Sequence, residues 1–305
     1  MSSRAVVLCT VLVLACEGSA SKQATRNAAD STTVSIRDDF GHAITLGSPP
    51  KRIVSLNPST TEILFAIGAG SRLVGRTHWD SWPDSAKLVP DLGDGLRPNI
   101  EAVLQAHPDL VILYASNDNR AAADRLRTAG IQSAALRVDS IAQFRRTTLL
   151  LGRLVGEPAR AKNVVDSVQR TLDSVRAANA GLPRTSVFFH AWDNPLITIG
   201  RNSFLNELVV IGGGRNVYDD IAEASPVVTL EDVVKRNPDA LLVGPFVAKS
   251  ILASAQWQAV PAVRAKHVFV YDTNLVGRPS VTLGMAAVNI ARLLHPQGTN
   301  PPIHR

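Results

Sequence analysis

Residues 99–113 read NIEAVLQAHPDLVIL, and residues 229–243 read TLEDVVKRNPDALLV. Each stretch predicts a short helix with an acid in its first turn, Glu101 or Glu231, followed by a Pro-Asp pair and an apolar strand. Chance agreement over such a stretch is rare. The repeat therefore predicts a duplicated α/β half, with its two copies 130 residues apart (231 − 101).

Strands and helices alternate on both sides of the first copy. Residues 34–46 alternate apolar and polar side chains about a Gly-containing turn, which is typical of a hairpin. Residues 52–56 are strand-like, and Ser59 and Glu62 after them have the spacing of a capping box at the start of a helix. Further strands are expected at 73–76, 109–113 and 133–138.

A single long helix is expected between the copies, over 156–182, because apolar residues recur there at spacings of three and four. The second copy has strand-like runs at 185–189, 240–243 and 268–271. These runs are continuously apolar, which is typical of parallel sheets covered on both faces. The sequence therefore predicts an α/β fold with two parallel-sheet, Rossmann-like lobes, over 33–155 and 183–296, joined by one α-helix. A short tail is expected at 297–305.

The composition is that of a folded protein without a nucleic-acid partner. Apolar residues make up 45% and charged residues 19% of the 305 residues, which excludes a largely disordered chain. The 32 basic and 26 acidic residues leave a formal charge of +6. Because the basic residues are scattered and not gathered in a patch, the charge indicates a solvated surface.

The first 16 residues predict export from the cytoplasm. Arg4 precedes an eleven-residue run, 5–15, that is apolar apart from one threonine, too short to span a bilayer but typical of a signal peptide. The run ends at Ala15-Cys16, which is similar to a lipobox, so Cys16 is a candidate lipidation site. A plain secretory signal is the alternative. Residues 17–32 have the composition of a flexible tether.

Motifs of common enzymes are missing from the sequence. It contains no GxSxG, HExxH, CxxC or P-loop lysine, and both cysteines lie in the expected signal segment. The glycines at 68–70 and 212–214 follow helices and do not link a strand to a helix start. They therefore indicate helix C-caps and not a nucleotide-binding fingerprint. We expect no enzymatic activity.

Aromatic residues gather just beyond the predicted strands, where parallel sheets bind their ligands. They are Trp79, Trp82, Tyr114, Trp192 and Phe246. A single such ring could simply cap the core. Several rings at strand ends in both lobes favour a ligand-lining role, and each buried ring would contribute about 150–250 Å² of contact. The expected ligand is large and partly flat or apolar.

Two similar loops, His78-Trp79-Asp80 and His190-Ala191-Trp192-Asp193, add candidate polar groups to the cleft. His78 and His190 could contact a ligand, but a dedicated metal site usually needs a third ligand. No other histidine lies at a predicted strand end, so we expect no resident metal. Arg278, after the last predicted strand, is a candidate to bind a carboxylate, amide or phosphate oxygen. An ordinary surface arginine is the alternative.

Glu101 and Glu231 have two interpretations. A carboxylate in the first turn of a helix is stabilised by the helix N-terminus, and this role alone could explain them. Alternatively, two exposed acids on two rigid lobes provide a pair of docking points for a basic partner. Such points would set orientation more than affinity.

Five stretches together resemble the class III substrate-binding proteins of ABC importers, the iron-chelate and cobalamin-binding family with a helical backbone. They are RIVSLNPSTTEILFAIG (52–68), LVGRTHWDSWP (73–83), the two repeats above and GRPSVTLGMAAVNIARLLHP (277–296). The resemblance covers residues 33–296. It implies a ligand between two lobes, little hinge motion and delivery to a permease dimer that Glu101 and Glu231 would contact.

Within this family, the chain is most similar to the cobalamin-binding members. Trp79, Tyr114 and Arg278 match positions that contact the ligand there, whereas Gly95 and Ser225 stand where those members carry tryptophan. We therefore expect a lipid-anchored, extracytoplasmic receptor for a metal chelate, with cobalamin favoured. Ferric siderophores and haem are the alternatives, followed by a bare transition metal. An enzyme of the same architecture, such as a chelatase, or a signalling module without a transporter remains a rival.

Overall fold

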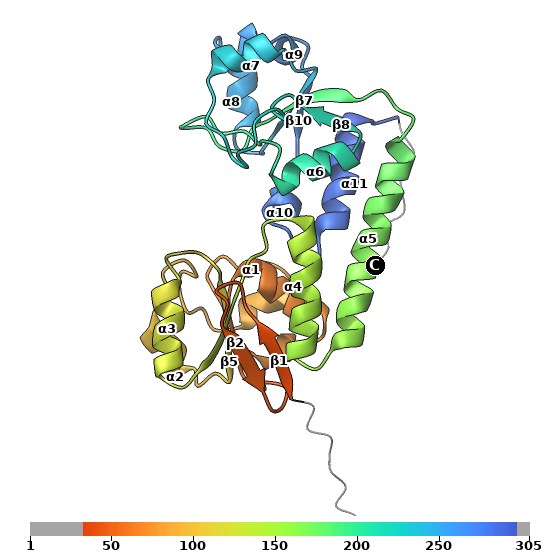
Figure 1. The fold of residues 1–305 in the computed structure, drawn as a ribbon. Helices are drawn as coiled ribbons and strands as arrows, with labels where there is room; N and C mark the ends of the chain where they lie inside the picture. Colours follow the sequence, from red (N-terminus) through yellow and green to blue (C-terminus); the bar gives the residue numbers. More distant parts are fainter. Residues whose placement is uncertain (1–32, 298–305) are drawn as a thin grey trace, which may run out of the picture. The chain divides into compact units, whose positions relative to one another are not determined.

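The computed structural model describes residues 33–297 of the chain. The expected signal segment with Cys16, the tether over 17–32 and residues 298–305 of the tail lie outside these residues. Two four-stranded parallel sheets organise the described chain, one near each end of a long helix, α5 (Pro158–Asn179) (Figure 1). This arrangement confirms the predicted fold class.

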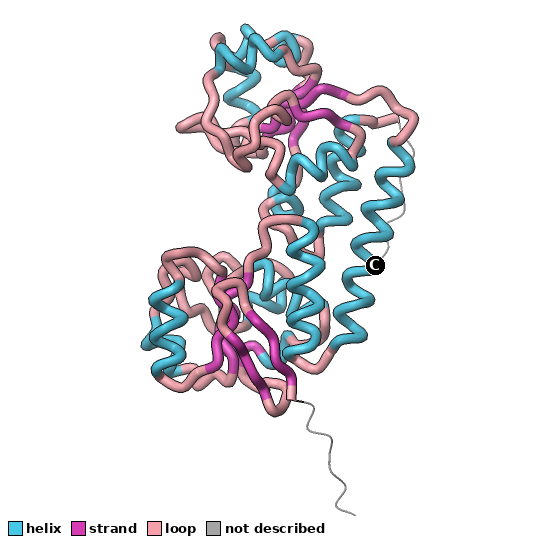
Figure 2. The backbone as a smooth tube through the Cα atoms, in the orientation of Figure 1, coloured by secondary structure: helices cyan, strands magenta, loops and turns pink. Residues whose placement is uncertain are grey.

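The N-terminal lobe precedes α5. Its elements are β1 (Val34–Arg37), β2 (Ala43–Leu46), β3 (Ile53–Leu56), α1 (Pro58–Ala66), β4 (Leu73–Gly75), α2 (Ile100–Gln105), β5 (Leu110–Tyr114), α3 (Arg120–Thr128), β6 (Gln132–Leu136) and α4 (Ile141–Leu154). The sheet has the order β4-β3-β5-β6, and β1 and β2 form the expected antiparallel hairpin. Helices lie on both sides of this sheet (Figure 2).

The C-terminal lobe follows α5. Its elements are β7 (Thr185–Phe189), α6 (Phe204–Ile211), β8 (Gly214–Asn216), α7 (Leu230–Arg236), β9 (Ala240–Val243), α8 (Ala248–Ala253), α9 (Pro261–Arg264), β10 (Val268–Val270), α10 (Thr273–Val276) and α11 (Leu283–Leu294). Its sheet has the order β8-β7-β9-β10, which matches the order of the first sheet strand for strand. The repeated helix-strand units are α2-β5 and α7-β9, as the sequence repeat predicts.

Helix α5 connects the lobes and packs against α4 of the first lobe and α11 of the second. At 22 residues it is about 33 Å long. Its buried face includes Ala161, Val165, Val168 and Leu172, which are spaced as an amphipathic helix requires. Within residues 33–297, no helix is both long enough and apolar enough to cross a membrane.

The start of α1 differs from the sequence prediction. The N-cap is Asn57 and not Ser59, because the Asn57 side chain accepts a hydrogen bond from the Ser59 backbone N–H at 3.0 Å. Pro58 occupies the first turn, where its fixed φ and missing N–H are tolerated. The capping-box interpretation of Glu62 is therefore wrong, and this side chain is available for another contact.

Short elements of the second lobe were not anticipated. Strand β8 has three residues, α8 has six, and α9 and α10 have four each, so none shows a readable hydrophobic period. The prediction that the glycines at 68–70 and 212–214 cap helices is confirmed in part. Gly68 and Gly213 have φ values of +84° and +86° after their helices, as C-caps require, but Gly214 begins β8.

Candidate ligand-binding site

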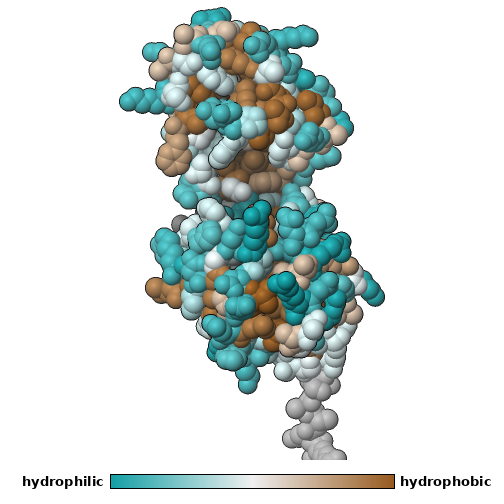
Figure 3. Space-filling view, turned by 90° about the vertical axis from the view of Figure 1, so that its left-hand side faces the viewer, coloured by the Kyte–Doolittle hydropathy of each residue, from teal (hydrophilic) through white to brown (hydrophobic). Residues whose placement is uncertain are grey.

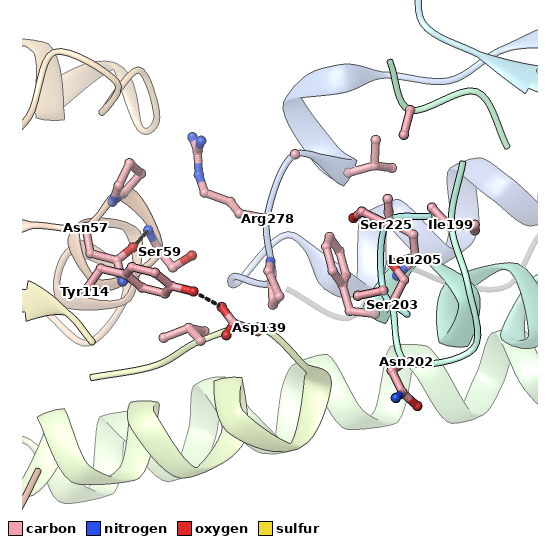
Figure 4. Close-up of a pocket in the computed structure, with 18 residues that line it drawn as sticks. Asn57, Ser59, Tyr114, Asp139, Ile199, Asn202, Ser203, Leu205, Ser225 and Arg278 are labelled. Carbon is pink, nitrogen blue, oxygen red and sulfur yellow. Dashed lines mark hydrogen bonds between the residues drawn. The ribbon is translucent and has the colours of Figure 1, made fainter. Parts of the chain in front are cut away.

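A cavity of about 470 Å³ lies between the lobes, where the strands of both sheets end. Its lining is formed by Asn57, Pro58, Ser59, Tyr114, Val138, Asp139, Ala191, Ile199, Asn202, Ser203, Phe204, Leu205, Ala224, Ser225, Val276, Gly277, Arg278 and Pro279 (Figure 4). In the space-filling view, apolar side chains gather at the waist between the lobes (Figure 3). A cavity of this size and placement is typical of a small-molecule site.

Tyr114 stands at the end of β5, and its hydroxyl donates a hydrogen bond to Asp139 Oδ1 at 2.9 Å. Burial raises the pKa of Tyr114 to about 12, and the hydrogen bond to the Asp139 carboxylate acts in the same direction. The phenol therefore stays protonated at neutral pH. It presents a ring and a fixed hydroxyl to the cavity.

Arg278 lies in the loop between α10 and α11, and its Nε donates to Glu62 Oε1 at 2.6 Å. Glu62 belongs to α1, so the pair joins the two lobes beside the cavity. The Glu62 side chain is 3% exposed and the Arg278 side chain 27%. Burial raises the pKa of Glu62, and this effect outweighs the lowering by the arginine.

A second buried carboxylate, Asp80, lies near this pair. It accepts hydrogen bonds from the Thr77 backbone N–H at 2.7 Å and from the Thr77 hydroxyl. Burial raises the pKa of Asp80, whereas hydrogen bonds from Thr61 and Thr77 and the charge of Arg278 oppose the rise. The Asp80 charge in turn raises the pKa of Glu62. The positive charge of Arg278 therefore lowers the pKa of both buried carboxyl groups and partly offsets the effect of burial.

The N-cap residue Asn57 contributes a further polar group to the cavity lining. Its Oδ1 accepts a hydrogen bond from the Ser59 N–H. Its buried Nδ2 makes no hydrogen bond within the part of the chain that the structure describes. A buried amide donor without a partner is costly. Asn57 is therefore a candidate to donate a hydrogen bond to a bound molecule.

A second hollow of about 320 Å³ lies at the strand ends of the C-terminal lobe. It is lined by His190, Ala191, Trp192, Asp193, Gly244, Phe246, Val247, Tyr271 and Thr273. Trp192 is 62% and Phe246 92% exposed, although both are strongly apolar. Ala191 lines both the hollow and the inter-lobe cavity, so the two are neighbours.

His190 forms the polar part of this hollow. Its ring is buried, and Nε2 lies 3.3 Å from Asp193 Oδ1. Burial lowers the pKa of His190, although Asp193 acts in the opposite direction. The neutral imidazole is therefore favoured at neutral pH.

Three expected site residues do not line either cavity. Trp79 is 62% exposed, and its ring lies against His78, with centroids 4.4 Å apart. Trp82 lines a third hollow beside α5 and α11. The structure thus brings Tyr114 together with Arg278, and groups Trp192, Phe246 and His190 next to them. The proposed ligand contacts of Trp79, Trp82 and His78 stay predictions.

His190 lines the hollow of the C-terminal lobe, whereas His78 lines neither that hollow nor the inter-lobe cavity. Among residues 33–297, no group of three or more His, Cys, Asp or Glu side chains is arranged to hold a metal ion.

Three residues beside the cavity were not predicted as members of a site. Asp139 directly follows the strand predicted at 133–138, so the rule that ligands bind at strand ends could have identified it. Asn57 carried the signal of an N-cap residue before Pro58. Glu62 carried no signal of a site residue, because its contact with Arg278 depends on the packing of distant segments.

Glu101 and Glu231 occupy equivalent, exposed positions in the first turns of α2 and α7. Their helices begin at equivalent caps, since Asn99 accepts from the Ala102 N–H and Thr229 accepts from the Asp232 N–H. Each lobe therefore presents one acid in the same local setting.

The family profile described as periplasmic binding protein matches residues 53–275. The chain belongs to this family, and the resemblance inferred from its sequence motifs is confirmed. Members of the family are binding proteins that work with ABC transporter permeases.

Individual relatives agree with this assignment. The chain is 30% identical over 304 residues to the uncharacterized ABC transporter substrate-binding lipoprotein YvrC of Bacillus subtilis. The aligned region covers 96% of this chain and 96% of the relative. It is 25% identical to a vitamin B12-binding protein of Vibrio vulnificus over 234 residues, which cover 76% of this chain and 86% of the relative. The solved periplasmic heme-binding protein RhuT of Roseiflexus shares the fold, with a TM-score of 0.72 and 24% identity over 82% of this chain and 98% of that one.

Proposed function

We propose that this protein is the extracytoplasmic receptor of an ABC importer, that it captures cobalamin between its lobes, and that it delivers the vitamin to the permease. The observation that carries the proposal is the meeting of Tyr114 and Arg278, from different lobes, in one cavity. Both positions match ligand-contacting positions of cobalamin-binding family members. The vitamin B12-binding name of a relative at 25% identity supports the same cargo.

Two positions, one in each lobe, differ from the pattern of cobalamin-binding members. Gly95 and Ser225 stand where those members carry tryptophan, and only Ser225 lines the cavity here. A Cβ at Gly95 would lie 2.2 Å from the Leu56 carbonyl oxygen, so this backbone leaves no room for a side chain there. Trp192 and Phe246 offer exposed rings on the C-terminal lobe, and we propose that they supply the missing aromatic contacts.

Haem or a ferric siderophore is the second candidate cargo. The observation that favours haem is the hollow in which Trp192 and Phe246 stand beside the neutral imidazole of His190. A flat chelate could stack on these rings, and an imidazole is a common ligand of haem iron.

Titration with cyanocobalamin, hemin and ferric siderophores, followed by tryptophan fluorescence and calorimetry, distinguishes these cargoes. We expect cyanocobalamin to bind most tightly and to quench fluorescence, because Trp192 neighbours the cavity. Tyr114→Ala should weaken this binding by about tenfold or more, since a buried ring contributes several kcal/mol of contact. Tighter binding of hemin than of cyanocobalamin would refute the cargo assignment.

Trp79→Ala provides a second measurement on the same cargo. A loss of cyanocobalamin affinity in this variant would mean that the cargo extends past the cavity to the exposed Trp79 ring. Unchanged affinity would remove Trp79 from the ligand site. Phe269→Ala, on β10 and outside both cavity linings, is the control for loss of a ring, and thermal unfolding checks that this variant, whose ring packs against the core, is folded.

Delivery is proposed to use Glu101 and Glu231 as docking points for basic residues of the permease dimer. Both acids are exposed and lie in equivalent first turns, one on each lobe. Replacing both by Lys should abolish uptake while leaving cargo affinity in vitro unchanged, because neither residue lines the cavity. Glu223→Lys, an exposed acid elsewhere in the second lobe, is the control. Normal uptake by the double variant would contradict the docking role.

Membrane attachment is proposed to occur through a lipid on Cys16, after cleavage of the signal segment before it. The lipoprotein name of the Bacillus subtilis relative supports this anchor. Cys16→Ser should move the protein from the membrane fraction to the extracytoplasmic soluble fraction.

A further inference from the structure

The charges around the inter-lobe cavity are already balanced by protein groups. Among the described residues that line it, the charged side chains are Arg278 and Asp139. Arg278 is paired with the buried Glu62 at 2.6 Å and also interacts with the charge of Asp80. An anionic cargo would therefore have to compete with these carboxylates for the arginine.

Asp139 is the other charged group of the lining, and three contacts fix it. The Tyr114 hydroxyl donates to Oδ1 at 2.9 Å, and Arg137 Nε lies 3.6 Å from Oδ2. The Asp139 backbone N–H donates to Gln143 Oε1 at 2.7 Å. Figure 4 shows the carboxylate at the tip of the Tyr114 ring, on the same side of the cavity as Asn57 and Ser59.

A fixed carboxylate has unused acceptor capacity, because each of its oxygens can accept more than one hydrogen bond. The Asp139 side chain is 46% exposed, so a bound molecule can reach it. A carboxamide N–H would find an ionised acceptor there, and hydrogen bonds to charged groups are the stronger kind. A carboxylate at the same place would be repelled by the like charge.

Resting on the proposed function, we infer that Asp139 selects the class of cargo. It accepts hydrogen bonds from the side-chain amides of an uncharged, amide-bearing chelate, and it rejects chelates that present carboxylates to this wall. Tyr114 is a positioning residue in this scheme, because its hydroxyl holds the Asp139 carboxylate. Asn57 Nδ2, on the same wall, is available to the carbonyl oxygen of a cargo amide.

The test compares cyanocobalamin with its monocarboxylates, in which one side-chain amide has been hydrolysed. We expect the wild type to bind at least one monocarboxylate about tenfold more weakly than the vitamin, which is the size of a lost charge-assisted hydrogen bond. Asp139→Asn should reduce this preference to about twofold or less, because the introduced amide can donate to the carboxylate as well as accept from the amide.

Two variants serve as controls. Asp84→Asn removes the same charge from a side chain that is 95% exposed in the same lobe, and it should keep the wild-type preference. Tyr114→Phe removes the hydroxyl but leaves the Asp139 charge, so it should weaken binding while still favouring the amide. Circular dichroism and thermal unfolding establish that each variant is folded.

The outcomes separate this inference from the proposed function. If the wild type binds cyanocobalamin but Asp139→Asn keeps the full preference, or if the wild type binds every monocarboxylate as well as the vitamin, only the role of Asp139 is wrong. If the wild type binds none of these corrinoids, the cobalamin assignment fails and the selection by Asp139 fails with it.

Discussion

The pair between Glu62 and Arg278 gives a quantitative prediction about how the lobes are held together. Its nitrogen and oxygen are 2.6 Å apart, which corresponds to about 6 kcal/mol of Coulomb attraction at an effective dielectric of about 20. Desolvation of the two ions offsets most of this energy. Removing one partner of a buried pair nevertheless costs about 3–5 kcal/mol, because the other charge stays buried. Arg278 is partly exposed and keeps Asp80 as a neighbour, so we expect Glu62→Ala to cost about 2–3 kcal/mol.

Glu62→Gln removes the charge of this side chain while keeping its size and shape, so it measures the contribution of the charge. The amide oxygen can still accept from Arg278, and the repulsion between Glu62 and Asp80 is removed. We expect a loss of about 1 kcal/mol, because a neutral amide oxygen is a weaker acceptor for the Arg278 guanidinium than a carboxylate. Urea unfolding curves at pH 7.5 measure both variants, and Glu223→Gln, an exposed acid, should stay within about 0.5 kcal/mol of the wild type.

The same pair predicts that the folding stability depends on pH. Because burial raises the folded-state pKa of Glu62, the folded protein binds this proton more readily than the unfolded chain. The contribution of Glu62 to stability therefore grows as the pH falls from 7 through the raised folded pKa towards the ordinary range of a glutamate. Glu62→Gln removes that gain, so the stability gap between wild type and variant should widen on acidification. A gap that shrinks as the pH falls, or a Glu62→Ala variant as stable as the wild type, would refute this account of the pair.

Two further predictions concern the strand ends. Gly95→Ala should destabilise the protein by about 1–3 kcal/mol in urea unfolding, because its Cβ would collide with the Leu56 carbonyl, whereas Gly47→Ala, with no atom within 4 Å, should be nearly neutral. The pH dependence of stability that we expect from His190 is opposite to that from Glu62. Burial lowers the folded-state pKa of His190, so stability should be lost as the pH falls below 6.5. His190→Gln should lose less stability between pH 7 and 5.5, and an equal loss in both proteins would rule out His190 as the cause.

The architecture was readable from the sequence because its determinants are local and repeated. The α2-β5 and α7-β9 units carry the same order of acid, Pro-Asp pair and apolar run, and continuous apolar strands indicate parallel sheets. The period of α5 was long enough to identify it as one helix. Elements of three to six residues, such as β8 and α8, offer no period to detect.

The site was predictable only in part, because a strand end fixes where a side chain starts and not where it points. Tyr114 and Arg278 meet in the cavity, but Trp82, which also follows a predicted strand, lines a separate hollow beside α5 and α11. The contact between Glu62 and Arg278 joins residues 216 positions apart. No local pattern encodes a pair at that separation, and the capping-box spacing of Glu62 suggested a different role.

The two lobes share one scaffold, yet the ends of their equivalent strands have diverged. After β3 the chain turns at Asn57 straight into α1, so a helix start and its cap face the cavity. After β7 a loop carries His190 and Trp192, and α6 begins only at Phe204. Duplication thus supplies two matching sheets, whereas the different connections give the cavity a polar wall in the first lobe and a largely apolar one in the second. For the amide-bearing cargo that we propose, these two walls predict one orientation, with its amides towards the first lobe and its flat, apolar part towards the second.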